Sequence, residues 1–341
     1  MVVVTEDTDG APGDRVLATG RLPGYVKTTP AVQLYRSRRN LRMVRRLKLD
    51  PSVPLVFNNI VNAGGCAVGL PNPTIGFIND YNNFPSERHR YGLGSRLGKA
   101  LLAALEKRAA ERVDLVVVNS LYMRDLVRKY YAVDDSKIEV LYKGLAIDPD
   151  VPPVRPFEEG APVRILFVKT DFKRGGLPTL LEALQQLPPT DRYELTVIGT
   201  TEENYRRQMG GYAMGSNVRI DWLGRCPPEI VQQKMEQTHI FCLPALSEAL
   251  GVANMEAMMR NCRLITTGVG GIPEVTDRGR NCLEVPPGDA EAVARAILRL
   301  REEAPEQCWQ RTARARAYVI EHFREEKAYA RLLELIEKVR S

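Results

Sequence analysis

Long apolar runs, histidines and closely paired cysteines are scarce in this chain of 341 residues. No run of eighteen apolar residues occurs, which argues against a transmembrane helix. The N-terminus shows no basic segment followed by an apolar core, so no signal peptide is expected. The three histidines and six separated cysteines lack the spacing of metal ligands. We therefore expect no bound metal, no disulfide and a reducing, cytoplasmic environment.

Acidic residues are missing from one long segment. Residues 15–49 contain ten Lys and Arg and no Asp or Glu, and residues 1–150 carry the whole net charge of +6. The densest part is Arg36–Lys48, and the apolar residues in and beside it are spaced for one helix face: Leu34, Leu41, Val44 and Leu47. Such a helix could lie on the inner face of an anionic membrane or bind a phosphorylated acceptor. It could also be a solvated helix, whereas nucleic acid is disfavoured because no aromatic residues alternate with the arginines.

Strand-like apolar runs alternate with helical segments along the chain, which predicts parallel sheets with helices on both faces. The strands expected in the first half are Val2–Thr5, Leu55–Asn58, Thr74–Ile78, Leu115–Asn119 and Ile138–Tyr142, with clear helices at Leu93–Arg112 and Leu121–Tyr131. Those expected in the second half are Arg164–Val168, Glu194–Ile198, Val218–Trp222, Ile240–Leu243, Arg263–Thr266 and Cys282–Val285, followed by helices over Ala290–Arg301 and Trp309–Val339.

Five prolines between Asp148 and Pro162 indicate a boundary between two domains. Proline is excluded from helix interiors and central strands, so this stretch is predicted to be a linker. We expect an N-terminal domain over residues 1–149, a linker over 150–162, a second domain over 163–308 and C-terminal helices over 309–341.

Two glutamates flank the predicted start of a helix at Gly251. Glu248 lies in the loop after the strand-like run His239–Pro244, and Glu256 lies within the helix. The free N–H groups of a helix N-terminus suit a phosphate, and a carboxylate in the loop can accept hydrogen bonds from hydroxyls. A nucleoside diphosphate that carries a sugar offers both groups. Because such a pair of glutamates is common in helices, the hypothesis also depends on the turn Gly270-Gly-Ile-Pro-Glu274.

Together, Glu248, Glu256 and this turn resemble the pattern of the retaining family 4 glycosyltransferases (glycosyl transferases group 1), over roughly residues 100–300. The resemblance implies the α/β GT-B fold, in which two doubly wound Rossmann-like domains face a cleft and the last helix crosses back to the first domain. It implies transfer of a sugar from a UDP or GDP sugar to a glycan, lipid-linked or small-molecule acceptor. The anomeric configuration is retained, and no metal or other cofactor is needed.

The resemblance assigns the donor site to the second domain. Glu248 contacts hydroxyls of the sugar, Glu256 binds the ribose, and the backbone N–H groups of Gly251 and Val252 face the diphosphate. Leu250 stands where the family usually has Phe, which changes the sugar pocket. The backbone of the loop residues Gly224 and Arg225 meets the base.

A basic loop after the strand Arg164–Val168 supplies the positive charge that a leaving diphosphate requires. Its candidates are Lys169, Lys173 and Arg174. Arg174 matches the arginine of the family pattern. Gly175, however, stands where the family has lysine, and Lys173 stands where an acidic residue is usual, so the phosphate ligand stays open.

The acceptor side resembles the family less. The segment Thr74–Tyr81 resembles a strand that ends in His-Asp-Tyr, with Asn79 in place of the histidine and with Asp80 and Tyr81 matching. Asn79 can bind hydroxyls but cannot carry a proton, whereas Asp80 could receive the acceptor's proton or stabilise charge at the sugar. Met1–Thr5 resembles the family's second strand, so we expect its first strand, glycine loop and helix to be missing; alternatively, Met1–Thr5 is the first strand and residues 9–13 serve as that loop.

Two other functions fit the sequence. A sugar-nucleotide epimerase has the same fold, although it lacks the glutamate pair with the Gly-Gly turn. A subunit that binds a nucleotide without turnover would explain the shortened N-terminal domain and Gly175.

Overall fold

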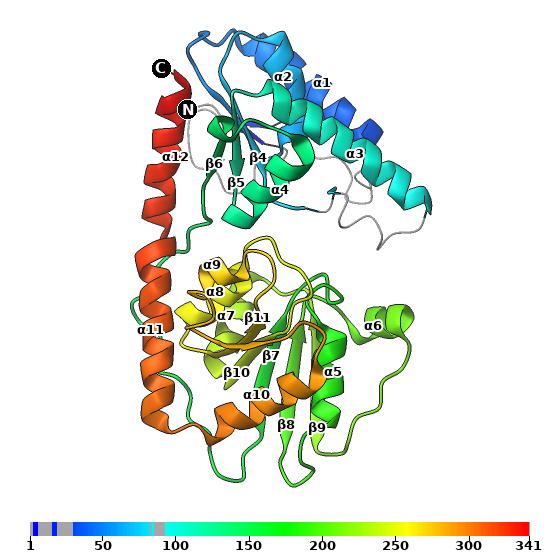
Figure 1. The fold of residues 1–341 in the computed structure, drawn as a ribbon, viewed down its shortest axis with the longest axis vertical. Coiled ribbons are helices and arrows are strands. Elements are labelled where there is room, and N and C mark those ends of the chain that lie inside the picture. The colour runs from blue at the N-terminus through cyan, green and yellow to red at the C-terminus, as the bar shows by residue number, and fades with distance from the viewer. Residues whose placement is uncertain (1–2, 6–15, 19–29, 82, 85–92, 341) are drawn as a thin grey trace. The chain divides into compact units, whose positions relative to one another are not determined.

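The computed structural model describes residues 3–5, 16–18, 30–81, 83–84 and 93–340. The chain divides into two compact units: Met1–Tyr142 with Ala328–Ser341, and Lys143–Lys327. Each unit contains a parallel sheet with helices packed on it, which confirms the predicted α/β class (Figure 1). The proline-rich stretch groups with the second unit, so the division falls ahead of residue 149.

The first unit has a four-stranded parallel sheet in the order β3-β4-β5-β6. Its elements are β3 (Leu55–Phe57), β4 (Thr74–Ile78), β5 (Leu115–Val118), β6 (Ile138–Val140), α1 (Pro30–Leu47), α2 (Ile60–Gly69), α3 (Leu93–Arg112) and α4 (Leu121–Tyr131). The strands β1 (Val3–Thr5) and β2 (Val16–Ala18) form a separate parallel pair. The alternative loop over residues 9–13 lies outside the described residues.

The C-terminal helix α12 (Glu325–Arg340) completes the core of the first unit. Leu335 is fully buried in a cluster with Ile75, Leu115 and Val117 of the sheet. Glu139 on β6 accepts hydrogen bonds from Arg331 at 2.8 Å and from Lys338 at 2.6 Å. The helix is therefore held by apolar packing at its centre and by ion pairs at its edge.

The basic helix α1 packs differently from the predicted stripe. Val44 is buried as predicted, but Leu34 is 42% exposed. Instead the helix buries Ser37, whose Oγ accepts a hydrogen bond from the backbone N–H of Gly65 on α2 at 2.9 Å. A Cβ on Gly65 would lie 2.7 Å from that oxygen, so α1 and α2 are in close contact here. The buried face of α1 therefore includes Ser37 and excludes Leu34.

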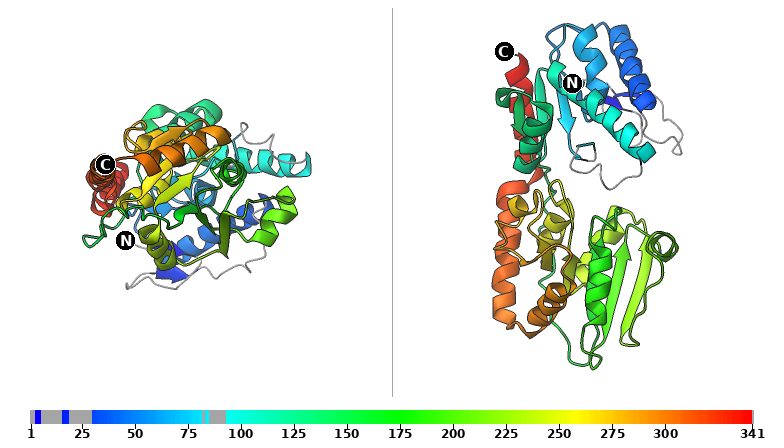
Figure 2. Two further views of the ribbon diagram at one scale, coloured as in Figure 1. Left: turned by 90° about the horizontal axis from the view of Figure 1, so that it is seen from below. Right: turned by 45° about the vertical axis from the view of Figure 1, so that its right-hand side comes forward.

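The second unit has a six-stranded parallel sheet in the order β12-β11-β10-β7-β8-β9, with helices on both faces (Figure 2). Its strands are β7 (Val163–Val168), β8 (Tyr193–Ile198), β9 (Val218–Gly224), β10 (Ile240–Leu243), β11 (Arg263–Thr267) and β12 (Leu283–Val285). Its helices are α5 (Leu177–Gln185), α6 (Glu202–Met209), α7 (Pro228–Gln237), α8 (Val252–Met259), α9 (Ile272–Val275), α10 (Ala290–Glu302) and α11 (Pro305–Phe323). The strand order reverses between β7 and β10, and doubly wound sheets bind ligands at such a point.

A neutral histidine is buried at the start of β10 in this sheet. His239 is 2% exposed, and its Nδ1 accepts a hydrogen bond from the backbone N–H of Arg164 at 3.0 Å. Burial, together with the charges of Arg164, Arg263 and Arg155, lowers its pKa to about 4. The folded protein therefore resists protonation of this ring.

We expect this histidine to make the second unit sensitive to acid. Because the unfolded chain binds the proton below about pH 6.5 and the folded chain only near pH 4, stability should fall as pH drops through that window. The loss should reach about 3 kcal/mol at pH 4, because each pH unit between the pKa of the unfolded chain and that of the folded chain contributes about 1.4 kcal/mol. Urea unfolding between pH 7 and 4 measures it. His239→Asn should flatten the dependence, whereas His322→Asn, on an exposed ring, should leave it unchanged; an unaltered slope in His239→Asn would contradict the assignment.

Candidate functional site

Two loops meet at the carboxyl ends of β7 and β10. The loop Lys169–Gly176 follows β7, and the loop Pro244–Gly251 follows β10. The backbone N–H of Leu246 donates to the carbonyl of Arg174 at 2.7 Å. Gly176 has a φ of 77°, and a Cβ there would lie 1.9 Å from the carbonyl oxygen of Pro244. Glycine is thus required for the loops to approach this closely.

An ion pair joins two of the predicted site residues across these loops. Lys169 Nζ contacts Glu248 Oε2, and their side chains are 26% and 13% exposed. The other carboxylate oxygen of Glu248 accepts a hydrogen bond from the backbone N–H of Ala249 at 3.2 Å. A positive and a negative group are therefore fixed side by side at the switch point, partly shielded from solvent.

The Gly-Gly turn lies directly against the backbone of Glu248. Gly270 has a φ of 60°, and a Cβ there would lie 1.8 Å from the carbonyl oxygen of Glu248. Gly271 donates its backbone N–H to the same oxygen at 3.3 Å. Glycine is therefore required at both positions. The loop after β11 packs on the backbone around Glu248 so closely that a Cβ has no room.

Helix α8 begins beside this ion pair with an uncapped N-terminus. Gly251 is its N-cap, with a φ of 97°, and no side chain caps the first turn. Val252 is half-buried, whereas Leu250 is 1% exposed and belongs to the core. The helix thus begins three residues after Glu248, and its first backbone N–H groups have no side-chain cap and carry positive partial charge.

The basic loop orients Arg174 but leaves Lys173 in solvent. Arg174 Nε donates to Ser247 Oγ at 3.4 Å, which links the guanidinium to the second loop. Lys173 is exposed and forms no ion pair within the described part of the chain. Of the predicted cations, Lys169 and Arg174 therefore lie closest to the loop that carries Glu248.

Glu256 lines a separate cavity of about 280 Å³ in the second unit. The other lining residues are mostly apolar: Leu145, Ala146, Val168, Cys226, Pro228, Val231, Gln232, Met235, Met259 and Arg260. Burial raises the pKa of the Glu256 carboxyl, while Lys143 and Arg260 act in the opposite direction. The predicted residues Gly224 and Arg225 do not line the cavity, but Cys226 of the same loop does. The lining thus combines an apolar wall with one carboxylate, Glu256, and one guanidinium, Arg260.

The first unit holds a polar cavity of about 350 Å³ at the end of β4. Asn79 and Asp80 are exposed and line it. Tyr81 is 1% exposed and packs edge-on against Tyr122, so it supports the loop instead of contacting a ligand. Asn79 and Asp80 are therefore brought together as predicted, and Tyr81 is not.

Sequence reasoning missed Glu106 and Gln33, which also line this cavity. Glu106 is 7% exposed, and its carboxylate accepts hydrogen bonds from Asn83 Nδ2 at 3.0 Å and from the Tyr131 hydroxyl at 2.5 Å. Burial raises its pKa. The available signal was a lone acidic residue in the apolar run Leu101–Glu106.

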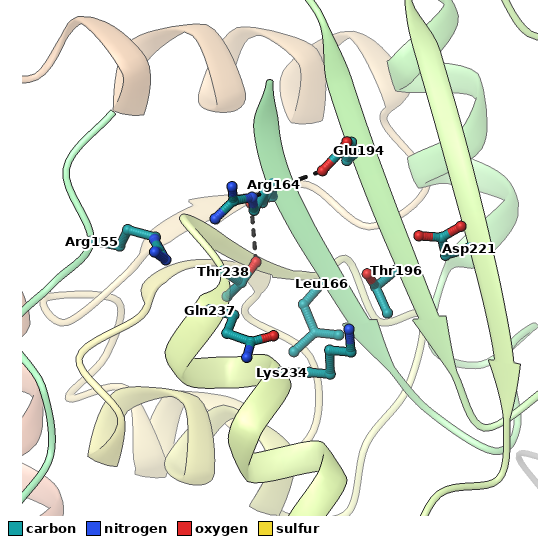
Figure 3. A pocket seen from close by; sticks show the side chains of 9 residues that line it. All are labelled: Arg155, Arg164, Leu166, Glu194, Thr196, Asp221, Lys234, Gln237 and Thr238. Atoms are coloured by element: carbon teal, nitrogen blue, oxygen red, sulfur yellow. Dashed lines mark hydrogen bonds and ion pairs between the residues drawn. The ribbon is translucent and has the colours of Figure 1, made fainter. Parts of the chain in front are cut away.

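A third cavity lies on the sheet of the second unit between α7 and β7–β9 (Figure 3). Arg164 Nε is 3.8 Å from Glu194 Oε2 there, and Lys234 approaches from α7. Arg164 and Glu194 stand near the amino ends of their strands. This groove is therefore separate from the loops around Glu248, and we assign it no part in donor binding.

Comparisons with known proteins cover both units. Residues 154–318 match the family model Glycosyl transferases group 1, and residues 1–149 match Glycosyltransferase Family 4. The amylovoran biosynthesis glycosyltransferase AmsK of Erwinia amylovora is 30% identical over 187 residues, which is 52% of this chain and 45% of that protein. The chain spans about half the length of the curated relatives it matches.

Solved structures match over nearly the whole chain. Sucrose-phosphate synthase from Thermosynechococcus elongatus has a TM-score of 0.76 at 18% identity, covering 97% of this chain and 84% of that one. HepE from Anabaena in complex with UDP-glucose has a TM-score of 0.68 at 16% identity, covering 95% and 86%. These likenesses show the fold. With the two family matches, they place this chain among the family 4 glycosyltransferases, which have the two-domain GT-B fold.

Proposed function

We propose that this glycosyltransferase moves a sugar from a nucleoside-diphosphate sugar to an acceptor hydroxyl and retains the anomeric configuration. The Lys169–Glu248 ion pair beside the uncapped start of α8 is the observation that carries the proposal. It offers donors for a diphosphate and an acceptor for sugar hydroxyls within one loop cluster. A nucleotide sugar is the donor class that needs both.

Different residues of the second unit bind different parts of the donor. The backbone N–H groups at Gly251 and Val252, together with Arg174, bind the diphosphate. Glu256 accepts hydrogen bonds from the ribose, and the apolar wall of its cavity takes the base. Glu248 binds the sugar beyond the diphosphate. The observation that favours UDP over other nucleotides is that HepE, which shares the fold, was solved in complex with UDP-glucose.

The chemical step exchanges one C–O bond for another. The bond between the anomeric carbon and the diphosphate oxygen breaks, and the acceptor oxygen bonds to that carbon on the same face. The acceptor's proton passes to the departing phosphate oxygen. Arg174 and the helix N–H groups stabilise the charge that develops on this phosphate. No step needs a metal, so EDTA should leave the rate unchanged.

A thermal-shift screen of UDP, GDP, ADP and their sugars tests the donor class, because a ligand that binds only the folded state raises the melting temperature. The nucleotide found is then offered as its sugar with a glycan acceptor, and the product's anomeric protons are followed by NMR. Conversion of UDP-N-acetylglucosamine alone into its epimer would favour the epimerase. Nucleotide binding without hydrolysis or transfer would favour the non-catalytic subunit.

The basic helix α1 is proposed to hold the protein on an anionic membrane surface. Among the described residues no helix is apolar enough over a sufficient length to cross a bilayer. On α1, Leu34 and Tyr35 are 42% and 54% exposed, and they line a hollow of about 390 Å³ with Arg38, Arg39 and Arg42. Exposed apolar side chains among arginines suit the interface of an anionic bilayer.

Changing Arg38, Arg42 and Arg46 to Gln should weaken binding to phosphatidylserine liposomes about a hundredfold, because each basic residue near the surface contributes about 1 kcal/mol. Co-sedimentation at low salt measures the binding, and added salt should reduce it for the wild type. Changing three exposed arginines of the second unit, Arg207, Arg295 and Arg299, to Gln is the charge-matched control. If the wild type ignores anionic liposomes, α1 is a solvated helix.

A further inference from the structure

The groove on the sheet of the second unit is lined by more positive than negative side chains. It has a volume of about 280 Å³, and its lining comes from β7, β8, β9, α7 and the proline-rich stretch before β7 (Figure 3). Its cations are Arg155, Arg164 and Lys234, and its carboxylates are Glu194 and Asp221. Pockets for drug-sized ligands start at about 300 Å³, so this groove suits a small metabolite.

Both carboxylates already have a positive partner. Glu194 Oε2 lies 3.8 Å from Arg164 Nε. Asp221 Oδ1 lies 3.3 Å from Nη2 of Arg219, which does not line the groove. The structure describes the whole second unit, and two cations of the lining form no ion pair and no side-chain hydrogen bond with any described residue: Arg155 and Lys234. The groove therefore has an excess of positive charge that no described carboxylate balances.

The backbone of Arg155 is fixed, although this residue belongs to the proline-rich stretch. Its carbonyl accepts a hydrogen bond from Nη1 of the buried Arg263 at 2.7 Å, and the Cζ of Arg263 lies 4.2 Å from the centroid of the Phe157 ring. The charges of Arg164, Arg263 and Arg155 also act on His239, whose pKa is lowered first by burial and then by these three residues. Positive potential is therefore concentrated at the arginine end of the groove.

Neutral polar groups line the other part of the groove. Figure 3 shows Arg155 and Arg164 toward one end, and Thr196 with Asp221 toward the other. The side chains of Thr196 and Gln237 form no hydrogen bond with any described residue. Hydroxyl, amide and carboxylate groups all bind the hydroxyls of a ligand. The groove thus matches a ligand with an anion at one end and hydroxyls along the rest.

We propose that this groove binds a small phosphorylated polyol of the sugar phosphate class. Arg155 and Arg164 bind the phosphate, for which the planar guanidinium is well suited. Thr196, Gln237 and Asp221 bind the hydroxyls. The groove lies near the amino ends of β7 and β8, whereas the donor loops follow the carboxyl ends of β7 and β10. The sugar phosphate therefore binds without displacing a nucleotide, and this site does not depend on the proposed transfer.

Isothermal calorimetry on the full chain at low salt tests this site. The probes are glucose 6-phosphate, mannose 6-phosphate and fructose 6-phosphate, with inorganic phosphate and free glucose for comparison. At least one sugar phosphate should bind, inorganic phosphate should bind about tenfold more weakly because it lacks the hydroxyls, and glucose should not bind. Arg155→Gln should weaken the best probe about tenfold, the loss of a charge-assisted hydrogen bond. Lys234→Gln should weaken it about threefold, because its positive charge is lost.

Two further variants locate the bound probe. Arg299→Gln, at an exposed position on α10, is the charge-matched control and should leave the affinity unchanged. Arg174→Gln, in the donor loops, should also leave it unchanged. A loss in Arg174→Gln as large as that in Arg155→Gln would place the probe on the donor loops and overturn the proposal. Thermal melting checks the fold, which Arg155→Gln should preserve because its carbonyl still accepts the hydrogen bond from Arg263.

The remaining outcomes are equally decisive. Binding of no sugar phosphate, or unchanged affinity in Arg155→Gln, would overturn the site. Inorganic phosphate that binds as tightly as the best sugar phosphate would overturn the role of the hydroxyls. Titration of UDP and GDP into the same samples reports on the donor loops, so a chain that binds a sugar phosphate but no nucleotide would contradict the transfer proposal and support this one.

Discussion

Replacing Glu248 by glutamine should reduce sugar transfer about a hundredfold, while the affinity for free UDP or GDP stays within about twofold. Glutamine keeps the size of the side chain but loses the negative charge that pairs with Lys169 and accepts hydrogen bonds from sugar hydroxyls. Charge-assisted hydrogen bonds contribute about 1.5–3 kcal/mol, and a hundredfold loss corresponds to about 2.7 kcal/mol. Initial rates of transfer and isothermal calorimetry with the free nucleotide measure the two quantities.

The control for this variant is Glu182→Gln, at an exposed position on α5 of the same unit. It should change neither the rate nor the affinity. Equal losses of transfer and nucleotide affinity in Glu248→Gln would show that this carboxylate binds the nucleotide and not the sugar.

Glu256→Ala should weaken nucleoside diphosphate binding by about ten- to a hundredfold, the loss of one or two charge-assisted hydrogen bonds to ribose. The fold should survive, because Arg260 keeps its ion pairs with Asp148 at 2.9 Å and with Glu236. Calorimetry measures the affinity, and thermal melting checks the fold. Glu229→Ala, at an exposed position in the first turn of α7, is the matched control.

The pH dependence of nucleotide affinity is a second test of the role of Glu256. Burial raises the pKa of Glu256, so the carboxylate gains a proton at a higher pH than an exposed glutamate does. Nucleotide affinity should therefore decline on acidification before exposed carboxylates titrate, and Glu256→Ala should lack this decline. Wild-type affinity in Glu256→Ala, with the fold intact, would place the ribose elsewhere.

Local sequence was sufficient for the donor loops. The strand ending at Leu243, the loop with Glu248 and the helix after Gly251 are contiguous, so the pattern of apolar residues and glycine predicted their order. The reason for the Gly-Gly turn is tertiary, since Gly270 packs on the carbonyl of Glu248 across a different loop. The resemblance found this motif, and the structure explains it.

The acceptor side could not be predicted as well, because its side chains are positioned by contacts between segments far apart in the sequence. Glu106 is held by Tyr131, twenty-five positions along the chain, and no periodicity relates the two. On α1 the apolar spacing predicts that Leu34 lies on the buried face. The close packing of Ser37 on Gly65 instead buries Gln33 and Ser37 and leaves Leu34 exposed. The motif that ends in Tyr81 predicts a residue on the acceptor side, yet the ring of Tyr81 is buried in the core. Side-chain direction at these positions is set by packing that a linear pattern does not encode.

The burial of Leu335 against β4 and β5 has a consequence for how the protein is made. The ribosome synthesises the sheet of the first unit before the second unit, but the helix that covers its apolar surface follows the second unit in the chain. Domains usually fold in the order of synthesis. Here the second unit, contiguous over Lys143–Lys327, can finish while the first still waits for its final helix. The sheet that is translated first is therefore completed only after the second unit, and until then the apolar residues Ile75, Leu115 and Val117 lack the helix that covers them.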